Sequence, residues 1–180
     1  MSRHLRNGAL LAAAGLLLTA AAPAAAAGRA TDSGTASLRG SGHVSVPAFP
    51  DDEIIFSVDA HSRYDDPMKQ PFPSQSWGTA RLSHSHAGYG TYWYSVAVDC
   101  LVTGGNTATV TGVIVETNPE SQKYVGDRVG FGVTDLGHHD RVSFTGPRQD
   151  GDPELRKCMA PATFLEMADG NLTVVDANHW

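Results

Sequence analysis

Hydrophobic and polar residues alternate along most of the chain after residue 42. Phe56 and Val58 alternate with Ser57 and Asp59, and the same period of two runs through 128–134. A period of two places successive side chains on opposite faces of a strand, so this pattern predicts strands with one buried face. The segments that fit are 43–46, 53–60, 77–84, 91–102, 106–117, 128–134, 141–145, and 163–167 with 171–176.

The residues between these segments are typical of tight connections. Gly104-Gly105 separates two long strand-like runs and predicts a hairpin, and Asp169-Gly170 predicts another between the last two segments. No segment of ten or more residues has helical periodicity, although Asn118-Pro119-Glu120 and Asp152-Pro153-Glu154 are each suited to open a single turn. The sequence therefore predicts an all-β fold of about eight strands. Either an antiparallel closed barrel or a two-sheet sandwich fits, and the succession of hairpins favours the barrel.

The first 27 residues have the three parts of a secretory signal. Arg3 and Arg6 give a positive start, 9–18 is a short apolar run, and an alanine-rich tract ends in Ala25-x-Ala27. We therefore expect a signal peptide over 1–27, secretion, and no membrane attachment after cleavage. Residues 28–42 are rich in Gly, Ser, Thr and Ala and predict a flexible leader, which leaves 43–180 as a single β domain.

Charge and cysteine content narrow the picture further. The formal charge is −6 and no run of Lys and Arg is interleaved with aromatic residues, which argues against a nucleic-acid partner. In an oxidising compartment the two cysteines, Cys100 and Cys158, are expected to pair, the alternatives being free or reactive thiols. Cys100 continues the alternation of 92–98, which predicts a sulfur facing the interior. Cys158 lies in the long loop 146–161, which a bridge would hold down.

One part of the chain resembles a known family. The segments 97–105 and 106–113, with 128–131 and His139-Asp140-Arg141 downstream, are similar to small secreted actinobacterial proteins that are often labelled repetin. The resemblance covers roughly 35–176. It implies a secreted, β-rich domain with one cysteine on a central strand and another late in the chain. It implies no activity and no catalytic residues.

Two histidine pairs are candidate metal ligands. His84-Ser85-His86 places two imidazoles on one side of a strand, and His138-His139 could complete a site from another loop. Zn, Cu and Ni accept imidazole well. Hydrated histidines at a polar strand end are the simpler interpretation, so we expect no metal and no other cofactor.

Five aromatic residues lie close together in the sequence: Trp77, Tyr89, Tyr92, Trp93 and Tyr94. If exposed together, they would form a platform for a sugar ring or a peptide. The alternative is that they pack within the fold, because aromatic residues are favoured in strands. The acidic clusters 51–53, 65–66 and 150–154 are interpreted as solvated loops.

No catalytic motif is present, so the sequence assigns no catalytic residue. There is no Gly-x-Ser-x-Gly, His-Glu-x-x-His, phosphate-binding loop or dinucleotide fingerprint. The leading hypothesis is a non-enzymatic, extracellular binding module whose ligand or protein partner is unknown, with a ligand pocket inside the barrel as one arrangement. The alternatives are an extracellular enzyme, either metal-dependent around His84 and His86 or a hydrolase with dispersed residues, and a structural protein of the cell surface.

Overall fold

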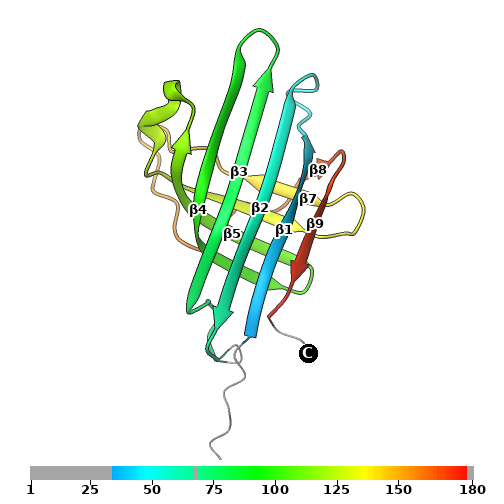
Figure 1. The fold of residues 1–180 in the computed structure, drawn as a ribbon, viewed down its shortest axis with the longest axis vertical. Helices are drawn as coiled ribbons and strands as arrows, with labels where there is room; N and C mark the ends of the chain where they lie inside the picture. Colours follow the sequence, from blue (N-terminus) through cyan, green and yellow to red (C-terminus); the bar gives the residue numbers. More distant parts are fainter. Residues whose placement is uncertain (1–33, 67–68, 178–180) are drawn as a thin grey trace, which may run out of the picture. The chain divides into compact units, whose positions relative to one another are not determined.

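A computed structural model describes residues 34–66 and 69–177, which form nine β-strands and one short 3-10 helix (Figure 1). The predicted signal peptide 1–27 lies outside these residues. Within the described part, no helix is long and apolar enough to cross a membrane. The elements are β1 (Gly34–Ser45), β2 (Glu53–Tyr64), β3 (Gln75–His86), β4 (Gly90–Gly104), β5 (Thr107–Thr117), η1 (Pro119–Tyr124), β6 (Arg128–Thr134), β7 (Arg141–Phe144), β8 (Leu165–Met167) and β9 (Asn171–Val175).

The strands close into an antiparallel barrel. Each strand from β1 to β8 pairs with the next, and β8 pairs back with β1, so eight strands form a ring. This confirms the predicted all-β fold and decides for the barrel over the two-sheet sandwich. The hairpin at Gly104-Gly105 and the turn at Asn118-Pro119 are also confirmed, the latter as η1. The turn expected at Asp152-Pro153-Glu154 is wrong, because 152–156 is irregular.

Strand β1 begins inside the segment that was predicted to be a flexible leader. The structure describes 34–42 as strand, paired with β2 along its length and with β9 at 37–41. Ala36 and Leu38 are buried in the alternating pattern of the other strands. Gly40 and Gly42 lie against the backbone of 169–172, where a Cβ atom would collide with carbonyl oxygens. The small residues that resembled a leader therefore serve close backbone contact.

The predicted hairpin at Asp169-Gly170 is also wrong. Strands β8 and β9 run in the same direction, and both pair with the same edge of β1. Met167 pairs with Val44 and Asn171 with Ser41, so three residues of one chain segment, 168–170, lie opposite two of the other. The turn-forming Asp-Gly sequence makes a bulge within one interrupted strand, where a positive φ is also required.

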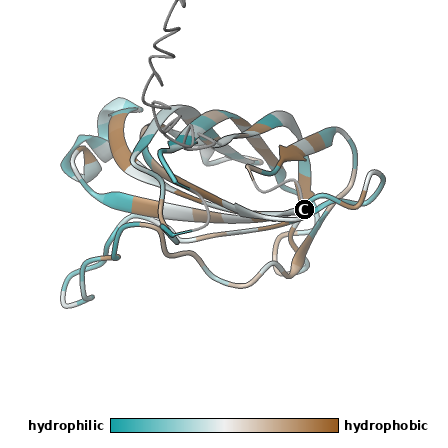
Figure 2. Cartoon of the chain, turned by 90° about the horizontal axis from the view of Figure 1, so that it is seen from below, coloured by the Kyte–Doolittle hydropathy of each residue, from teal (hydrophilic) through white to brown (hydrophobic). Residues whose placement is uncertain are grey.

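Side chains fill the interior of the barrel. Hydrophobic and hydrophilic residues alternate along the strands (Figure 2), and the apolar set forms one buried cluster. The rings of Phe56 on β2 and Phe131 on β6 stack with centroids 5.0 Å apart, so side chains from non-adjacent strands meet inside. An eight-stranded barrel is just wide enough for side chains to fill it. The structure therefore does not support a ligand pocket inside the barrel.

The chain segment 146–163 covers the outer side of β5, β6 and β7. Carbonyl groups of Met159 and Pro161 lie against Gly130 and Gly132, at distances that leave no room for a Cβ atom. The hydroxyl of Ser143 donates to the Pro161 carbonyl over 2.7 Å. Both faces of β6 are buried as a result.

The disulfide between Cys100 and Cys158 is confirmed, with Cα atoms 5.3 Å apart. Its predicted position toward the interior is wrong. The register of β4 against β5 shifts between Val98 and Cys100, which inserts Asp99 as an extra residue. Leu101 therefore continues the inward series and belongs to the core cluster, whereas Cys100 does not. The sulfur of Cys100 lies on the outer side, where it holds the covering segment.

The outer edge of β9 is capped by side chains. The amide of Leu172 donates to Asp140 Oδ2 over 2.6 Å, and the amide of Val174 donates to Asp135 Oδ2 over 3.0 Å. Both carboxylates come from the loop between β6 and β7. They accept hydrogen bonds that the edge of a sheet otherwise leaves open.

Candidate functional site

Two of the predicted histidines share one buried carboxylate. His84 and His86 end β3 two residues apart, so their side chains leave the strand on the same side. Ile54 pairs with His84, which brings the residue before β2, Asp52, next to both rings. The turn that precedes Asp52 also places the ring of Phe49 5.5 Å from that of His84.

The geometry fixes how the three side chains share their hydrogen bonds. Asp52 Oδ2 lies 2.5 Å from His84 Nε2, and Asp52 Oδ1 lies 2.5 Å from His86 Nδ1. Only 4% of the Asp52 side chain is exposed. The hydrogen bond from His84, and then that from His86, outweigh burial and hold the pKa of Asp52 below its usual range. An ionised Asp52 accepts from both rings, so His84 Nδ1 and His86 Nε2 remain for other partners.

A surface hollow of about 490 Å³ adjoins this group, and we call it the histidine hollow. Tyr89, at the tip of the β3–β4 hairpin, is 87% exposed and its ring lies 4.8 Å from that of His86. The hydroxyl of Tyr92 is buried without a hydrogen-bond partner among the described residues, and desolvation raises the pKa of Tyr92 to about 12. The hollow is lined by His84, His86, Tyr89, Gly90, Thr91, Tyr92, Asn118, Glu120 and Ser121.

The five predicted aromatic residues do not form one platform. Only Tyr89 and Tyr92 line the histidine hollow. Tyr94 is part of the barrel core. Trp93 lies on the outer side beneath Arg81, 3.9 Å from ring centroid to guanidinium carbon, and Trp77 stacks on His61 elsewhere on β2 and β3. Alternation along the strands separates residues that are adjacent in the sequence.

The structure does not bring the two histidine pairs together. His84 pairs with Tyr92 near the start of β4, whereas the loop that carries His138 and His139 follows Thr134, which aligns through β5 with Gly104 at the other end of β4. His139 instead lies 3.5 Å from Glu166. Over 34–66 and 69–177, no group of three or more His, Cys, Asp or Glu side chains has the arrangement of a metal site.

The sequence did not single out Asp52, which belonged to an acidic cluster interpreted as a solvated loop. The sequence did contain a sign of this contact. Asp52 lies directly before the predicted strand 53–60, and the next predicted strand along the chain runs into His84-Ser85-His86. The pairing of those two strands was not known, so the meeting of Asp52 with both histidines was not predictable.

Comparison of the chain with protein-family models, with curated proteins and with solved structures gives no match. The chemical character of the candidate site therefore rests on its own residues. Its features are two oriented imidazoles, an exposed phenol ring and a group of small polar side chains.

Proposed function

We propose that this protein is a secreted binding module, and that the histidine hollow holds a neutral, hydroxyl-rich ligand such as a glycan. The observation that carries the proposal is the pair of imidazoles that one buried carboxylate orients beside an open hollow with an exposed aromatic ring. Sites for small ligands combine apolar or aromatic surface with a few well-placed polar groups.

The polar groups of the hollow favour a donor-rich, uncharged ligand. His84 Nδ1 and His86 Nε2 can each accept a hydrogen bond from a hydroxyl group. Glu120 is a further acceptor, because the hydrogen bond from Asn118 Nδ2, 2.8 Å long, lowers the pKa of this carboxyl and keeps it ionised. None of the nine described lining residues is Lys or Arg, so nothing there balances an anionic ligand. The face of Tyr89 is available to a sugar ring.

Secretion is supported by the signal-like 1–27 segment and by the disulfide, which is the form expected of paired cysteines outside the reducing cytosol. The resemblance to small secreted actinobacterial proteins agrees with it. Amino-terminal sequencing of protein from culture medium tests this part. We expect the mature chain to start near Gly28, and a start at Met1 in soluble cell extract would contradict secretion.

Titration calorimetry with neutral oligosaccharides tests the ligand. We expect saturable binding by one member of a panel, weakened about tenfold or more in both Tyr89→Ala and His86→Ala, which corresponds to about 1.4 kcal/mol. Trp77→Ala is the matched control, because Trp77 is also an exposed aromatic residue but lies outside the hollow. Absence of saturable binding across the panel, or an equal loss in Trp77→Ala, would overturn the assignment.

A second candidate function is hydrolysis, and one observation favours it. His86 faces Asp52 through Nδ1 and keeps Nε2 free, which is the orientation of a histidine that acts as a general base. Chromogenic ester and glycoside substrates test this candidate. Turnover that falls at least a hundredfold in both His86→Gln and Asp52→Asn would support it, and turnover that survives in both variants would exclude it.

A further inference from the structure

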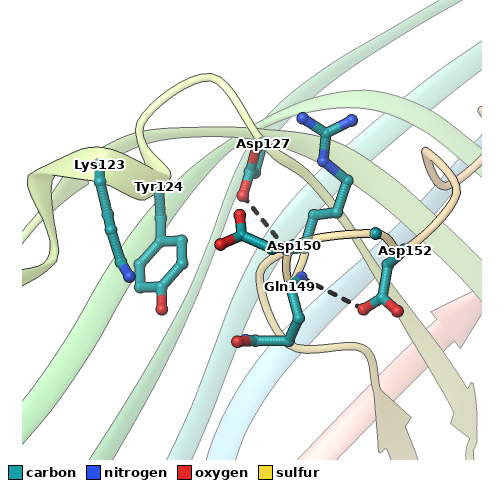
Figure 3. A pocket seen from close by; sticks show the side chains of 8 residues that line it. Lys123, Tyr124, Asp127, Gln149, Asp150 and Asp152 are labelled. Carbon is teal, nitrogen blue, oxygen red and sulfur yellow. Dashed lines mark hydrogen bonds between the residues drawn. The ribbon is translucent and has the colours of Figure 1, made fainter.

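Several surface hollows adjoin the covering segment 146–163, and the two largest of them differ in character. The first, of about 400 Å³, is lined by polar residues that include Lys123, Asp127 and Asp150 (Figure 3). Two of its three carboxylates accept hydrogen bonds from the local backbone. Asp127 accepts from the amide of Arg148 and Asp152 from the amide of Gln149, each over 3.2 Å. The local fold of the covering segment therefore accounts for the positions of these two carboxylates.

The second hollow, which we call the arginine pocket, is larger and has apolar walls. Its volume is about 610 Å³, within the 300–1,000 Å³ typical of small-molecule sites. Pro147, Pro153, Leu155 and Met159 form its apolar surface. Met159 is 52% exposed although it is a large hydrophobic residue, so apolar surface remains open there.

Of the three arginines that line the arginine pocket, one has acidic partners within the described part of the chain and two do not. Arg128 is engaged, because its guanidinium donates to Asp99 over 2.8 Å and to Glu154 over 3.2 Å. Arg148 and Arg156 also line the pocket, and neither side chain has an acidic partner within 4.0 Å among the described residues. Of the two carboxylates in the lining, Glu154 pairs with Arg128 and Asp152 accepts from the amide of Gln149. The pocket thus has three arginines against two carboxylates, and two of the arginines have no ion pair among the described residues.

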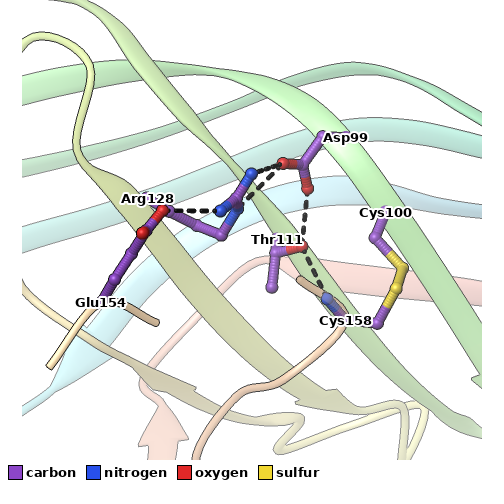
Figure 4. A network of polar contacts seen from close by, with 6 residues as sticks. All are labelled: Asp99, Cys100, Thr111, Arg128, Glu154 and Cys158. Carbon is purple, nitrogen blue, oxygen red and sulfur yellow. Dashed lines mark hydrogen bonds and ion pairs between the residues drawn. A yellow bond between two sulfur atoms is a disulfide. The ribbon is translucent and has the colours of Figure 1, made fainter. Parts of the chain in front are cut away.

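A polar network and the disulfide hold the pocket in place (Figure 4). The Thr111 hydroxyl donates to Asp99 over 2.7 Å and accepts from the amide of Cys158 over 3.0 Å. Asp99 in turn binds Arg128, which binds Glu154 on the pocket wall. Residues 154–158 are therefore fixed to β4, β5 and β6, and a fixed wall lowers the entropic cost of binding.

We propose that the arginine pocket binds a small organic anion that has an apolar ring or chain and one sulfonate, sulfate or carboxylate group. The apolar part lies against Leu155 and Met159, and the anionic group is bound by Arg148 and Arg156. Guanidinium groups suit such oxyanions because they present several N–H donors in a fixed plane. The proposal is independent of the histidine hollow.

Titration of the folded, disulfide-bonded protein with 8-anilinonaphthalene-1-sulfonate, followed by fluorescence, tests the proposal. We expect saturable binding of one probe molecule per chain. Arg148→Gln and Arg156→Gln should each weaken binding about fivefold to tenfold, because each removes one donor group for the sulfonate. Lys157→Gln is the matched control: it removes one positive charge from the same segment but does not line the pocket.

Three further measurements distinguish binding in the pocket from non-specific binding to apolar surface. N-phenyl-1-naphthylamine has the same rings without the sulfonate and should bind about tenfold more weakly. Met159→Glu should abolish probe binding while the thermal unfolding midpoint stays near that of the wild type, since Met159 is half exposed. His86→Ala should leave probe binding unchanged. Loss of binding in Lys157→Gln equal to that in Arg148→Gln, equal affinity for the uncharged probe, or no saturable binding would each overturn the proposal.

Discussion

Two regions of the barrel have the same alternation of residues along their strands, but their outward side chains have different surroundings. On the outer side of β1 to β3 and of β4 before Asp99, which we call the open wall, outward side chains meet solvent, as Arg39, Asp59 and Arg81 do. Where the segment 146–163 lies on the outer side of β5 to β7, the covered wall, outward positions are small and buried, as at Gly130, Gly132 and Ser143. The open wall has one layer of packing, and the covered wall has two.

This difference shows what an outward position contributes in each case. On the open wall an outward side chain meets solvent, and its contacts are exposed pairs such as Arg39 with Asp59, 3.1 Å apart. Such pairs contribute little to stability. On the covered wall an outward position is an interior position of a second layer, where lost contacts and added volume are both costly. Substitutions on the covered wall should therefore have the larger effects.

Removal of the disulfide should have the largest effect of the changes considered. The bridge closes a loop with a sequence separation of 58 residues. Chain-entropy arithmetic for a loop of that length gives about 4 kcal/mol of stabilisation. The Cys100→Ala/Cys158→Ala double variant should lose about that much free energy of unfolding in a urea titration.

The site of first proteolysis sharpens the same prediction. In the double variant, limited proteolysis should cleave within 146–161 before it cleaves any strand, because the covering segment loses its covalent anchor. First cleavage on the open wall, or an unchanged free energy of unfolding, would contradict the view that the bridge serves to hold the second layer.

A methyl group added to the covered wall should have the next largest effect. In Gly132→Ala the new Cβ atom would meet the Pro161 carbonyl oxygen and the Ser143 hydroxyl, each at 2.6 Å. Overpacking of this kind costs about 1–3 kcal/mol. The measurement is the free energy of unfolding from denaturant titration.

Gly146→Ala is the matched control, because nothing lies within 4 Å of its Cβ position in the same covering segment. Where the backbone tolerates it, a change from Gly to Ala stabilises by about 0.4–1 kcal/mol through the unfolded chain. The two substitutions should thus differ in sign. A neutral Gly132→Ala would mean that the covering segment is not packed against β6.

The sequence allowed the open wall to be predicted better than the covered wall. Strands of the open wall alternate cleanly, as along 53–60, so their existence and inward faces follow from local periodicity. At 128–134 the same alternation predicted the strand correctly. It did not reveal that the glycines between Val129, Phe131 and Val133 receive a distant segment, since the contact joins residues about 30 positions apart.

The predictions that failed have a related cause. A bulge at Asp99 turned Cys100 outward, and another at 168–170 replaced a hairpin. One extra residue reverses every following side chain, and local pattern does not mark its place. In the candidate site, His84 and His86 were found because they share one strand. Asp52 was missed because its contact depends on strand pairing.

A change on the open wall should be smaller. Arg81 lies over the ring of Trp93 and donates to Ser95 over 3.0 Å, both on the outer side. An exposed cation–π contact contributes about 0.5–1 kcal/mol. Arg81→Ala should therefore lower the free energy of unfolding by no more than about 1 kcal/mol and alter the fluorescence of Trp93. A loss as large as that in Gly132→Ala would remove the distinction between the two walls.

The smallest expected effect is a pH dependence at the bulge beside β1. The hydrogen bond from His43 Nδ1 to Asp169, 2.7 Å long, raises the pKa of His43 and lowers the pKa of Asp169. The contribution of His43 is complete below about pH 6.5 and is lost as pH rises through its raised pKa. That of Asp169 is complete above about pH 4 and is lost as pH falls. The pair therefore stabilises most between these values.

Unfolding titrations at several pH values check this prediction. The difference in stability between the wild type and His43→Gln should be greatest near pH 5.5 and should shrink by pH 8. In the wild type, the imidazole resonances of His43 should titrate above about pH 6.5. A midpoint below that value would show that the contact with Asp169 does not persist in solution.

The carboxylates along β9 bear on how this protein meets other chains. An uncovered strand edge is a template onto which a second polypeptide can add, which is how many β-rich proteins begin to aggregate. Here Asp135 and Asp140 accept hydrogen bonds from the amides of Val174 and Leu172, so these two amides are not free to pair with an incoming strand. We therefore expect the loop between β6 and β7 to limit self-association through the edge of β9. Its protection depends on that loop staying folded beside a strand with which it shares no ladder of backbone hydrogen bonds.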